Sequence, residues 1–126
     1  MDEKQFIQAV SERTGLTRQE AADLTRATLE TLAHRLSSGE ALELIMELPE
    51  GLAGAVRRGL GGRTESFGYQ DAVRRVAERN MLTEEETDRG MRAVLAELHE
   101  AISEREFVQL MSQLGSEFSQ AVASAE

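Results

Sequence analysis

The chain has 126 residues, with 14 Lys and Arg against 23 Asp and Glu, which gives a net charge of -9 at pH 7. Its 40% apolar and 29% charged residues are typical of a folded domain and not of a disordered segment. The absence of cysteine excludes disulfides, thiol catalysis and cysteine-ligated metals. No apolar run approaches the roughly 20 residues of a membrane helix, and the N-terminus does not resemble a signal peptide. We therefore expect a cytoplasmic protein without a membrane partner.

The acidity is concentrated in the second half of the chain. Residues 1–63 carry 8 basic and 10 acidic side chains, whereas residues 64–126 carry 6 and 13. A net-negative surface repels polyphosphate, and phosphate contacts dominate affinity for nucleic acids. The charge therefore makes a nucleic-acid partner unlikely.

The composition predicts an all-α protein. There are 16 Ala and 15 Leu against 7 Val and 3 Ile, and proline occurs only at Pro49. Ala and Leu favour helices, whereas β-branched residues favour strands. No segment shows the alternation of apolar and polar residues that a half-buried strand requires.

The first expected helix follows Asp2, whose side chain can cap it together with Gln5. The second opens at Thr17-x-x-Glu20, a capping box, and extends to about residue 36. The third opens at Ser37-x-x-Glu40 and stops before Pro49, because the residue before a proline avoids the helical region. A short fourth helix follows Pro49. The apolar stripes expected to face the core are Phe6, Ile7 and Val10, then Thr28, Leu29, Leu32 and Leu36, then Ala41, Leu44, Ile45 and Leu48, then Leu52, Val56 and Leu60.

The same four elements recur after an offset of 66 residues. Residues 1–60 and 67–126 align without a gap and share 16 identities in 60 positions. The equivalent caps are Gly68, Thr83-x-x-Glu86 and Ser103-x-x-Glu106, and the last helix begins near Gly115. The expected core residues are Ala72, Val73, Val76, Met91, Val94, Leu95, Leu98, Ile102, Phe107, Leu110, Met111, Leu114, Phe118, Ala121 and Val122.

This pattern predicts a tandem duplicated helical unit of about four helices per copy, packed as one pseudo-twofold helical bundle. Residues 1–126 form a single helical domain, in which a Gly-rich linker at 61–66 joins the repeats 1–60 and 67–126. Gly90 aligns with Leu24 and borders the buried stripe of its helix. We predict that the missing side chain lets the backbone of another helix, from the other copy, approach closely there.

The stretches Ala27–Leu32, Leu36–Ala41 and Glu47–Pro49 resemble the signature of an uncharacterised prokaryotic family, domain of unknown function 2267 (DUF2267). Phe67, the stretch 73–79 and the stretch 93–98 suit the second half of that family. The resemblance implies a duplicated all-helical unit over nearly the whole chain. It implies no catalytic residue, because no activity is agreed for the family.

Few residues indicate a site. Arg57 and Arg58, together with Arg63 after the glycine run 59–62, form the strongest basic cluster and a possible anion or partner contact. The run lacks the Lys-Ser/Thr end of a phosphate-binding P-loop, so we interpret it chiefly as a linker. Glu30 and His34, four residues apart on one helix, could clip a divalent ion, but no further ligand is fixed by the sequence.

We therefore predict a non-enzymatic helical protein that acts through a protein partner or self-association, with no cofactor, metal or small-molecule substrate indicated. The alternative is a nucleic-acid-associated regulator with a helix-turn-helix-like element around Pro49. Its recognition segment, residues 49–60, would have only Arg57 and Arg58 as basic side chains. A metal-binding protein or an enzyme is less favoured.

Overall fold

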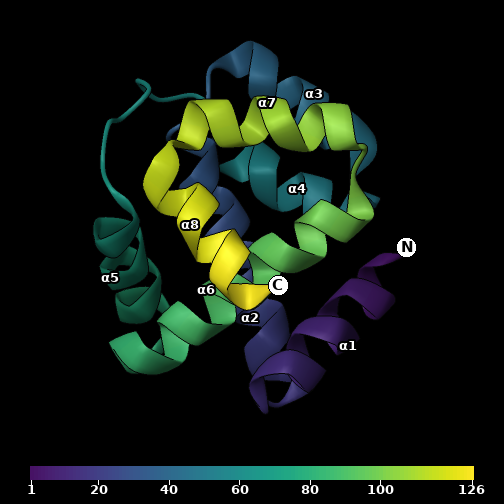
Figure 1. Ribbon diagram of the computed structural model, residues 1–126, viewed down its shortest axis with the longest axis vertical. Coiled ribbons are helices and arrows are strands. Elements are labelled where there is room, and N and C mark those ends of the chain that lie inside the picture. The colour runs from purple at the N-terminus through teal and green to yellow at the C-terminus, as the bar shows by residue number, and fades with distance from the viewer.

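The computed structural model describes residues 1–126, which form eight α-helices and no β-strand (Figure 1). The helices are α1 (Glu3–Thr14), α2 (Arg18–Ala33), α3 (Ser38–Glu47), α4 (Glu50–Arg58), α5 (Tyr69–Asn80), α6 (Glu84–Ala101), α7 (Glu104–Leu114) and α8 (Ser116–Ala125). The all-α prediction is confirmed. No helix combines the length and the apolarity needed to cross a membrane.

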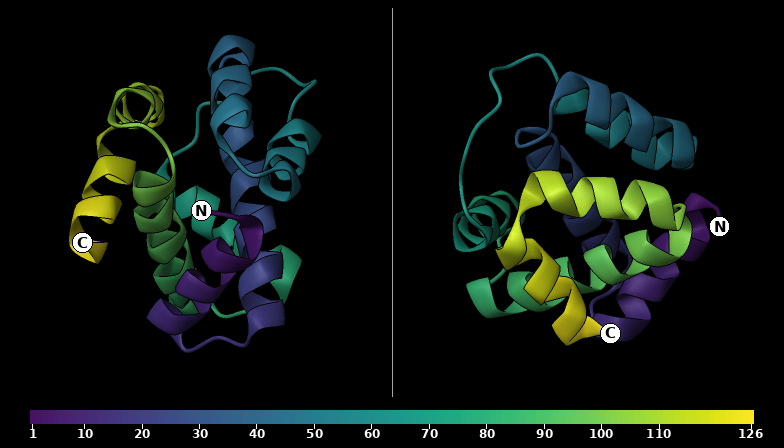
Figure 2. Two further views of the ribbon diagram at one scale, coloured as in Figure 1. Left: turned by 90° about the vertical axis from the view of Figure 1, so that its right-hand side faces the viewer. Right: turned by 45° about the horizontal axis from the view of Figure 1, so that its top comes forward.

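All eight helices contribute to one hydrophobic core. It is a contiguous cluster of 36 buried residues, and it contains nearly all of the predicted apolar stripes. The exceptions are Leu60 and Met111, which are only partly buried and pack against the cluster, and Thr28, which is buried but polar. The central helices α2 and α6 contact each other. The left view of Figure 2 shows α2–α4 and α6–α8 as two groups on opposite sides of the molecule.

The helices follow the same order in the two halves. Those of the second half begin at residues 69, 84, 104 and 116, each 66 residues after the start of its counterpart. The packing partners also correspond: α1 contacts both α2 and α6, and α5 contacts both α6 and α2. The first helix of each half therefore packs on the second helix of both halves.

Three N-terminal caps form as predicted. The side chain of Asp2 accepts from the amide of Gln5 at 2.8 Å, and that of Thr17 accepts from Glu20 at 3.1 Å. Thr83 caps α6 in the same way. In all three boxes the third helical residue returns a hydrogen bond to the cap amide, so two otherwise orphaned donors are satisfied.

The second helix ends earlier than predicted, at Ala33 instead of about residue 36. The amides of His34, Arg35 and Leu36 donate to carbonyls three residues back, so the chain tightens into a turn. This turn keeps Leu36 in the core while it redirects the chain into α3.

The fourth helix also ends earlier than predicted, at Arg58, which leaves Leu60 outside it. A Cβ at Gly59 would lie 2.3 Å from the carbonyl oxygen of Glu30. Gly59 therefore allows the end of α4 to approach the backbone of α2, a role that its place in a glycine-rich linker did not indicate.

Candidate functional site

Helices α3 and α7 form a layer at one end of the bundle (Figure 1). Two hydrogen bonds link the start of each helix to the end of the other. The amide of Ser37 donates to Oε1 of Gln113 at 2.9 Å, and the amide of Ser103 donates to Oε1 of Glu47 at 2.6 Å. The two helices are therefore antiparallel, and each supplies a cap to its neighbour.

This cross-helix capping corrects the prediction of complete capping boxes at Ser37-x-x-Glu40 and Ser103-x-x-Glu106. Each serine side chain does accept from the amide three residues later, at 3.2 Å. Neither glutamate returns a hydrogen bond to its cap amide, because the side chain from the facing helix already occupies that amide. The carboxylates of Glu40 and Glu106 are consequently free to turn elsewhere.

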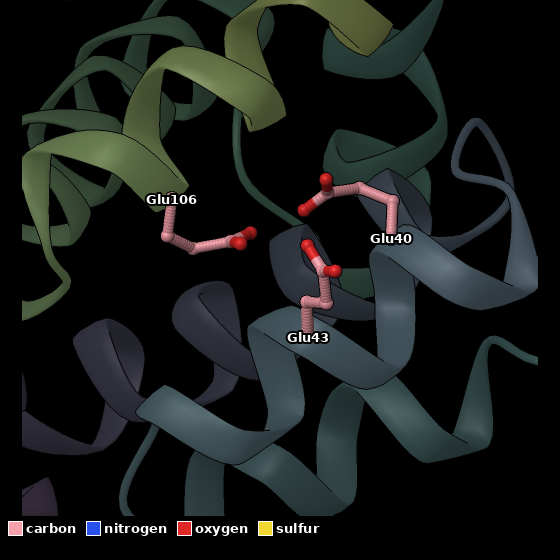
Figure 3. A group of neighbouring side chains, drawn as sticks. All are labelled: Glu40, Glu43 and Glu106. Atoms are coloured by element: carbon pink, nitrogen blue, oxygen red, sulfur yellow. The ribbon is translucent and has the colours of Figure 1, made fainter.

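They turn toward each other in the interface between α3 and α7. Glu40 is 7% exposed and Glu106 is 3% exposed, whereas Glu43, one turn after Glu40, is exposed. Figure 3 shows the three carboxylates converging from the two helices. One oxygen from each lies within 4.8 Å of the other two. We call Glu40, Glu43 and Glu106 the carboxylate cluster.

Two buried carboxylate oxygens of this cluster accept no hydrogen bond from the protein. Oε2 of Glu40 and Oε2 of Glu106 are both buried and have no hydrogen-bond partner. Arg105 lines the pocket beside the cluster but forms no ion pair with it. An unpaired buried carboxylate is costly, because it loses its hydration without compensation.

Burial raises the pKa of Glu106 to about 8, helped by a hydrogen bond to Glu40 and by the negative charges of Glu40, Glu43 and Glu47. The Glu106 carboxyl therefore holds a proton at neutral pH when nothing else neutralises the cluster.

The surface beside the cluster is both acidic and apolar. An open pocket there is lined by residues that include Glu43, Met46, Arg105 and Gln109. Met46 is 84% exposed, and Leu42 on α3 and Val108 on α7 are also exposed. Exposed apolar side chains are ordinary when they are isolated, and of these three only Met46 lines the pocket. We call this surface the α3–α7 face.

The predicted arginine cluster is not assembled into one site by the contacts observed. Arg57 pairs with Glu50 at 2.6 Å, and Arg58 lies 3.6 Å from Glu30. Arg63 forms no ion pair and lines a separate small pocket formed with the glycine-rich loop. The anion or partner contact of these arginines stays a prediction.

Glu30 and His34 point to different partners. The carboxylate of Glu30 accepts from Arg79 at 3.2 Å, and Nδ1 of His34 lies 4.0 Å from Glu65. The pair is not part of a cluster of three or more possible ligands. The hypothesis that Glu30 and His34 clip an ion thus gains no further ligand from the fold.

His99, in contrast, is held at the junction of α6, α7 and the C-terminus. Its ring stacks on Phe107 with centroids 3.8 Å apart, and its nitrogens contact carboxylate oxygens of Glu104 at 2.9 Å and Glu126 at 2.6 Å. Burial lowers the pKa of His99, but the hydrogen bonds and charges of these two carboxylates outweigh it and leave the pKa raised.

The sequence contains one signal for the carboxylate cluster, although the two S-x-x-E motifs by themselves predict only capping. Glu40 and Glu106 are identical at equivalent positions of the two halves, and Glu43 follows Glu40 by one helical turn. Residues one turn apart share a helix face. Only the packing of α3 on α7 brings the two faces together.

The fold and this layer define a class: an all-α protein with eight helices, one core and a carboxylate cluster between two antiparallel helices. The family model described as "Uncharacterized conserved protein (DUF2267)" matches residues 3–121, so the chain belongs to this family. The resemblance noted in the sequence is thereby confirmed. No curated protein matches the chain.

Proposed function

We propose that this protein is a non-enzymatic module that acts through protein contacts, and that the α3–α7 face is its contact surface. The observation that carries the proposal is the exposure of Met46, which lines the pocket beside the carboxylate cluster, together with exposed Leu42 and Val108 on the same two helices. Burying such side chains against a partner is favourable by roughly 25 cal/mol per Å² of apolar area.

The partner we propose is a basic amphipathic helix. Its apolar stripe would cover Leu42 and Met46, and its lysines or arginines would face Glu43 and Glu47. Complementary charge favours this partner over a second copy of the chain. Two copies meeting through this face would bring like charges together.

The alternative, a nucleic-acid-associated regulator, has less support. Its basic side chains would be Arg57 and Arg58 on α4, and both lie beside carboxylates of the same chain. A phosphate contact would have to compete with Glu50 and Glu30. The net charge of -9 opposes the approach of a polyanion as well.

We also propose that the two halves are a tandem duplication related by an approximate twofold axis. Support comes from the helix starts, which differ by 66 residues, and from the reciprocal caps. Ser37 is capped by Gln113, and their equivalents in the other half, Ser103 and Glu47, form the second cap. On a twofold axis a residue lies beside its own equivalent. Glu40 beside Glu106 fits this expectation.

Titration with two designed helical peptides tests the proposed contact. The peptides share one apolar face and carry either lysines or glutamates on the polar face. We expect the lysine peptide to bind and to shift the backbone amide NMR signals of α3 and α7, while the glutamate peptide does not bind. Equal binding of both peptides, or shifts confined to other helices, would contradict the proposal.

A matched pair of methionine variants sharpens the test. Met46→Gln should lower the affinity for the lysine peptide several-fold. Met81→Gln should not, because Met81 is 94% exposed in the turn between α5 and α6, far from α3 and α7 (Figure 1). Light scattering with size exclusion should find a monomer. A concentration-dependent dimer would favour self-association instead, and salt-dependent binding of duplex DNA would favour the regulator.

A further inference from the structure

The carboxylate cluster has the features of a set of metal ligands and not only of an acidic surface. Glu40 and Glu106 are buried, and each directs a carboxylate into the space between α3 and α7 (Figure 3). The two unpartnered oxygens, Oε2 of each residue, belong to these buried side chains. A folded protein satisfies nearly all of its buried polar atoms, so two orphaned oxygens in one place indicate a missing partner.

A cation would satisfy these oxygens and offset the charge of the cluster, and no basic side chain of the protein does so. Arg105 is the basic side chain that lines the adjoining pocket, and it makes no ion pair with any of the three carboxylates. Glu47 is already engaged, because its two oxygens accept from the amide and the hydroxyl of Ser103. Glu47 therefore adds negative charge beside the cluster while it remains fixed as a cap.

From this arrangement we propose that Glu40, Glu43 and Glu106 bind one divalent cation of the hard, oxygen-preferring class. Carboxylate oxygens are the ligands that Ca²⁺, Mn²⁺ and Mg²⁺ take in proteins, whereas Zn²⁺ and Cu²⁺ favour sites with imidazole or thiolate. Neither histidine belongs to the cluster.

The spacing is compatible with Ca²⁺, which forms longer bonds than Mg²⁺. Oxygens on opposite sides of a Ca²⁺ ion are about 4.6–5.2 Å apart, because each bond is about 2.3–2.6 Å long. The three oxygens lie within 4.8 Å of one another, so an ion could enter with little movement of either helix. Mg²⁺ demands near-ideal octahedral geometry and gives up its water reluctantly, so we expect it to bind the three carboxylates less tightly.

The pocket leaves room for the rest of a coordination shell. Glu43 is exposed and Gln109, at the equivalent position of α7, lines the same pocket. Water and the Gln109 side-chain carbonyl can supply further oxygens on this side. Because Glu40 and Glu106 come from different helices, the bound ion would cross-link α3 to α7 and stabilise the fold.

Titration of the full chain with Ca²⁺, Mn²⁺ and Mg²⁺, after treatment with EDTA and dialysis, tests the proposal. Calorimetry should find one ion per chain, with Ca²⁺ or Mn²⁺ tighter than Mg²⁺, and the thermal midpoint should rise with ion concentration. Mn²⁺ should broaden amide NMR signals in α3 and α7 before others. No binding of any of the three ions at millimolar concentration would overturn the proposal and would leave a shared proton as the sole occupant.

Isosteric variants locate the site. Glu106→Gln and Glu40→Gln should each reduce ion affinity at least about tenfold, the scale of loss when a metal site loses a supporting group. Glu100→Gln, an exposed glutamate near the end of α6, should leave the affinity within twofold of the parent. Unchanged affinity in both cluster variants would overturn the assignment.

Glu43→Gln guards against a folding artefact, since Glu43 is exposed and its replacement does not disturb the core. Glu43→Gln should also lower the affinity for the ion. An affinity equal to that of the parent would contradict the assignment of Glu43 as a ligand. Glu43 takes part in both proposals, but Met46→Gln tests only the peptide contact and Glu106→Gln only the ion, so the two proposals can fail separately.

Discussion

Gly90 and Leu24 occupy equivalent positions in the two halves, and they contact each other where α6 crosses α2. A Cβ built on Gly90 would lie 2.5 Å from Cδ2 and 2.9 Å from Cδ1 of Leu24, which is fully buried. The missing side chain at Gly90 therefore makes the space that the Leu24 side chain fills. As predicted, a helix of the other half packs against Gly90, but it does so through the Leu24 side chain and not through a close approach of its backbone.

Gly90→Ala should lower the free energy of unfolding. Alanine gains roughly 1 kcal/mol of helix propensity over glycine, but overpacking a core costs about 1–3 kcal/mol. The overpacking should win, because the whole branched end of Leu24 would have to move within a filled core. A denaturant titration should therefore give a lower midpoint than the parent.

Two further variants separate overpacking from other effects of Gly90→Ala. Gly39→Ala, in the first turn of α3 with nothing near its Cβ, should raise the midpoint. In a Leu24→Ala background, Gly90→Ala should become stabilising, since the obstructing side chain is gone. A raised midpoint for Gly90→Ala in the parent background would refute the argument.

Met81 is the only non-glycine residue with a positive φ, 55°, and it ends α5 in the left-handed conformation. Gly15 ends α1 in the same way with φ 78°. A side chain in this conformation costs about 1–2 kcal/mol, partly offset because glycine loses more chain entropy on folding. Met81→Gly should therefore raise the free energy of unfolding by about 0.5–1 kcal/mol.

Gly15→Ala supplies the reciprocal test. No atom lies within 4 Å of the added Cβ, so only backbone strain can act, and the variant should be destabilised. If thermal melts show no gain for Met81→Gly and no loss for Gly15→Ala, strain at these helix ends does not contribute to stability.

Thr17 and Thr83 should each contribute as N-caps. Replacing either by alanine leaves a helix amide without its acceptor, at a typical cost of about 1 kcal/mol. Thr17→Ser and Thr83→Ser keep the hydroxyl and should melt close to the parent. If the alanine variants have the same thermal midpoints as the serine variants, the caps do not contribute to stability.

In EDTA, stability should fall as the pH rises from about 4.5 toward 8. Burial raises the pKa of Glu106 from 4.5 in the unfolded chain to about 8 in the folded protein. The folded state therefore binds the proton more tightly, and this advantage is complete below pH 4.5 and lost as the pH passes the folded pKa. Glu106→Gln should flatten the dependence in denaturant titrations across this range.

His99 contributes with the same sign, because its pKa is also raised in the folded state. His99→Gln removes that contribution, which acts only above the ordinary histidine value of 6.5. A parental pH dependence between 4.5 and 6.5 in Glu106→Gln would therefore contradict the assignment to Glu106.

Local sequence patterns are sufficient to predict the helices, most of their caps and the side of each helix that faces the core. These features depend on residues three or four positions apart, such as Thr17 and Glu20, whose side chains and amides form hydrogen bonds within one helical turn. The gap-free alignment also paired Gly90 with Leu24 and so indicated where two helices come close. Helix ends were less certain, since the turn at residues 34–36 depends on how α3 packs.

The orientation of the Glu40 and Glu106 carboxylates depends on tertiary packing. Their local motif matches that of Glu20 and Glu86, yet the latter pair closes capping boxes on exposed helix ends while the former turns inward. A side chain of the facing helix has taken the cap amide, and no local pattern encodes that competition.

Arg35 shows the same limit of sequence reasoning. Its guanidinium donates to the carbonyls of Phe67 and Leu114, partners 32 and 79 residues away. Hydrogen bonds within one helical turn can be predicted from the local sequence, because both partners lie a few residues apart. Contacts between helices depend on how all eight helices share one core, and the carboxylate cluster exists only because that packing lays α3 against α7.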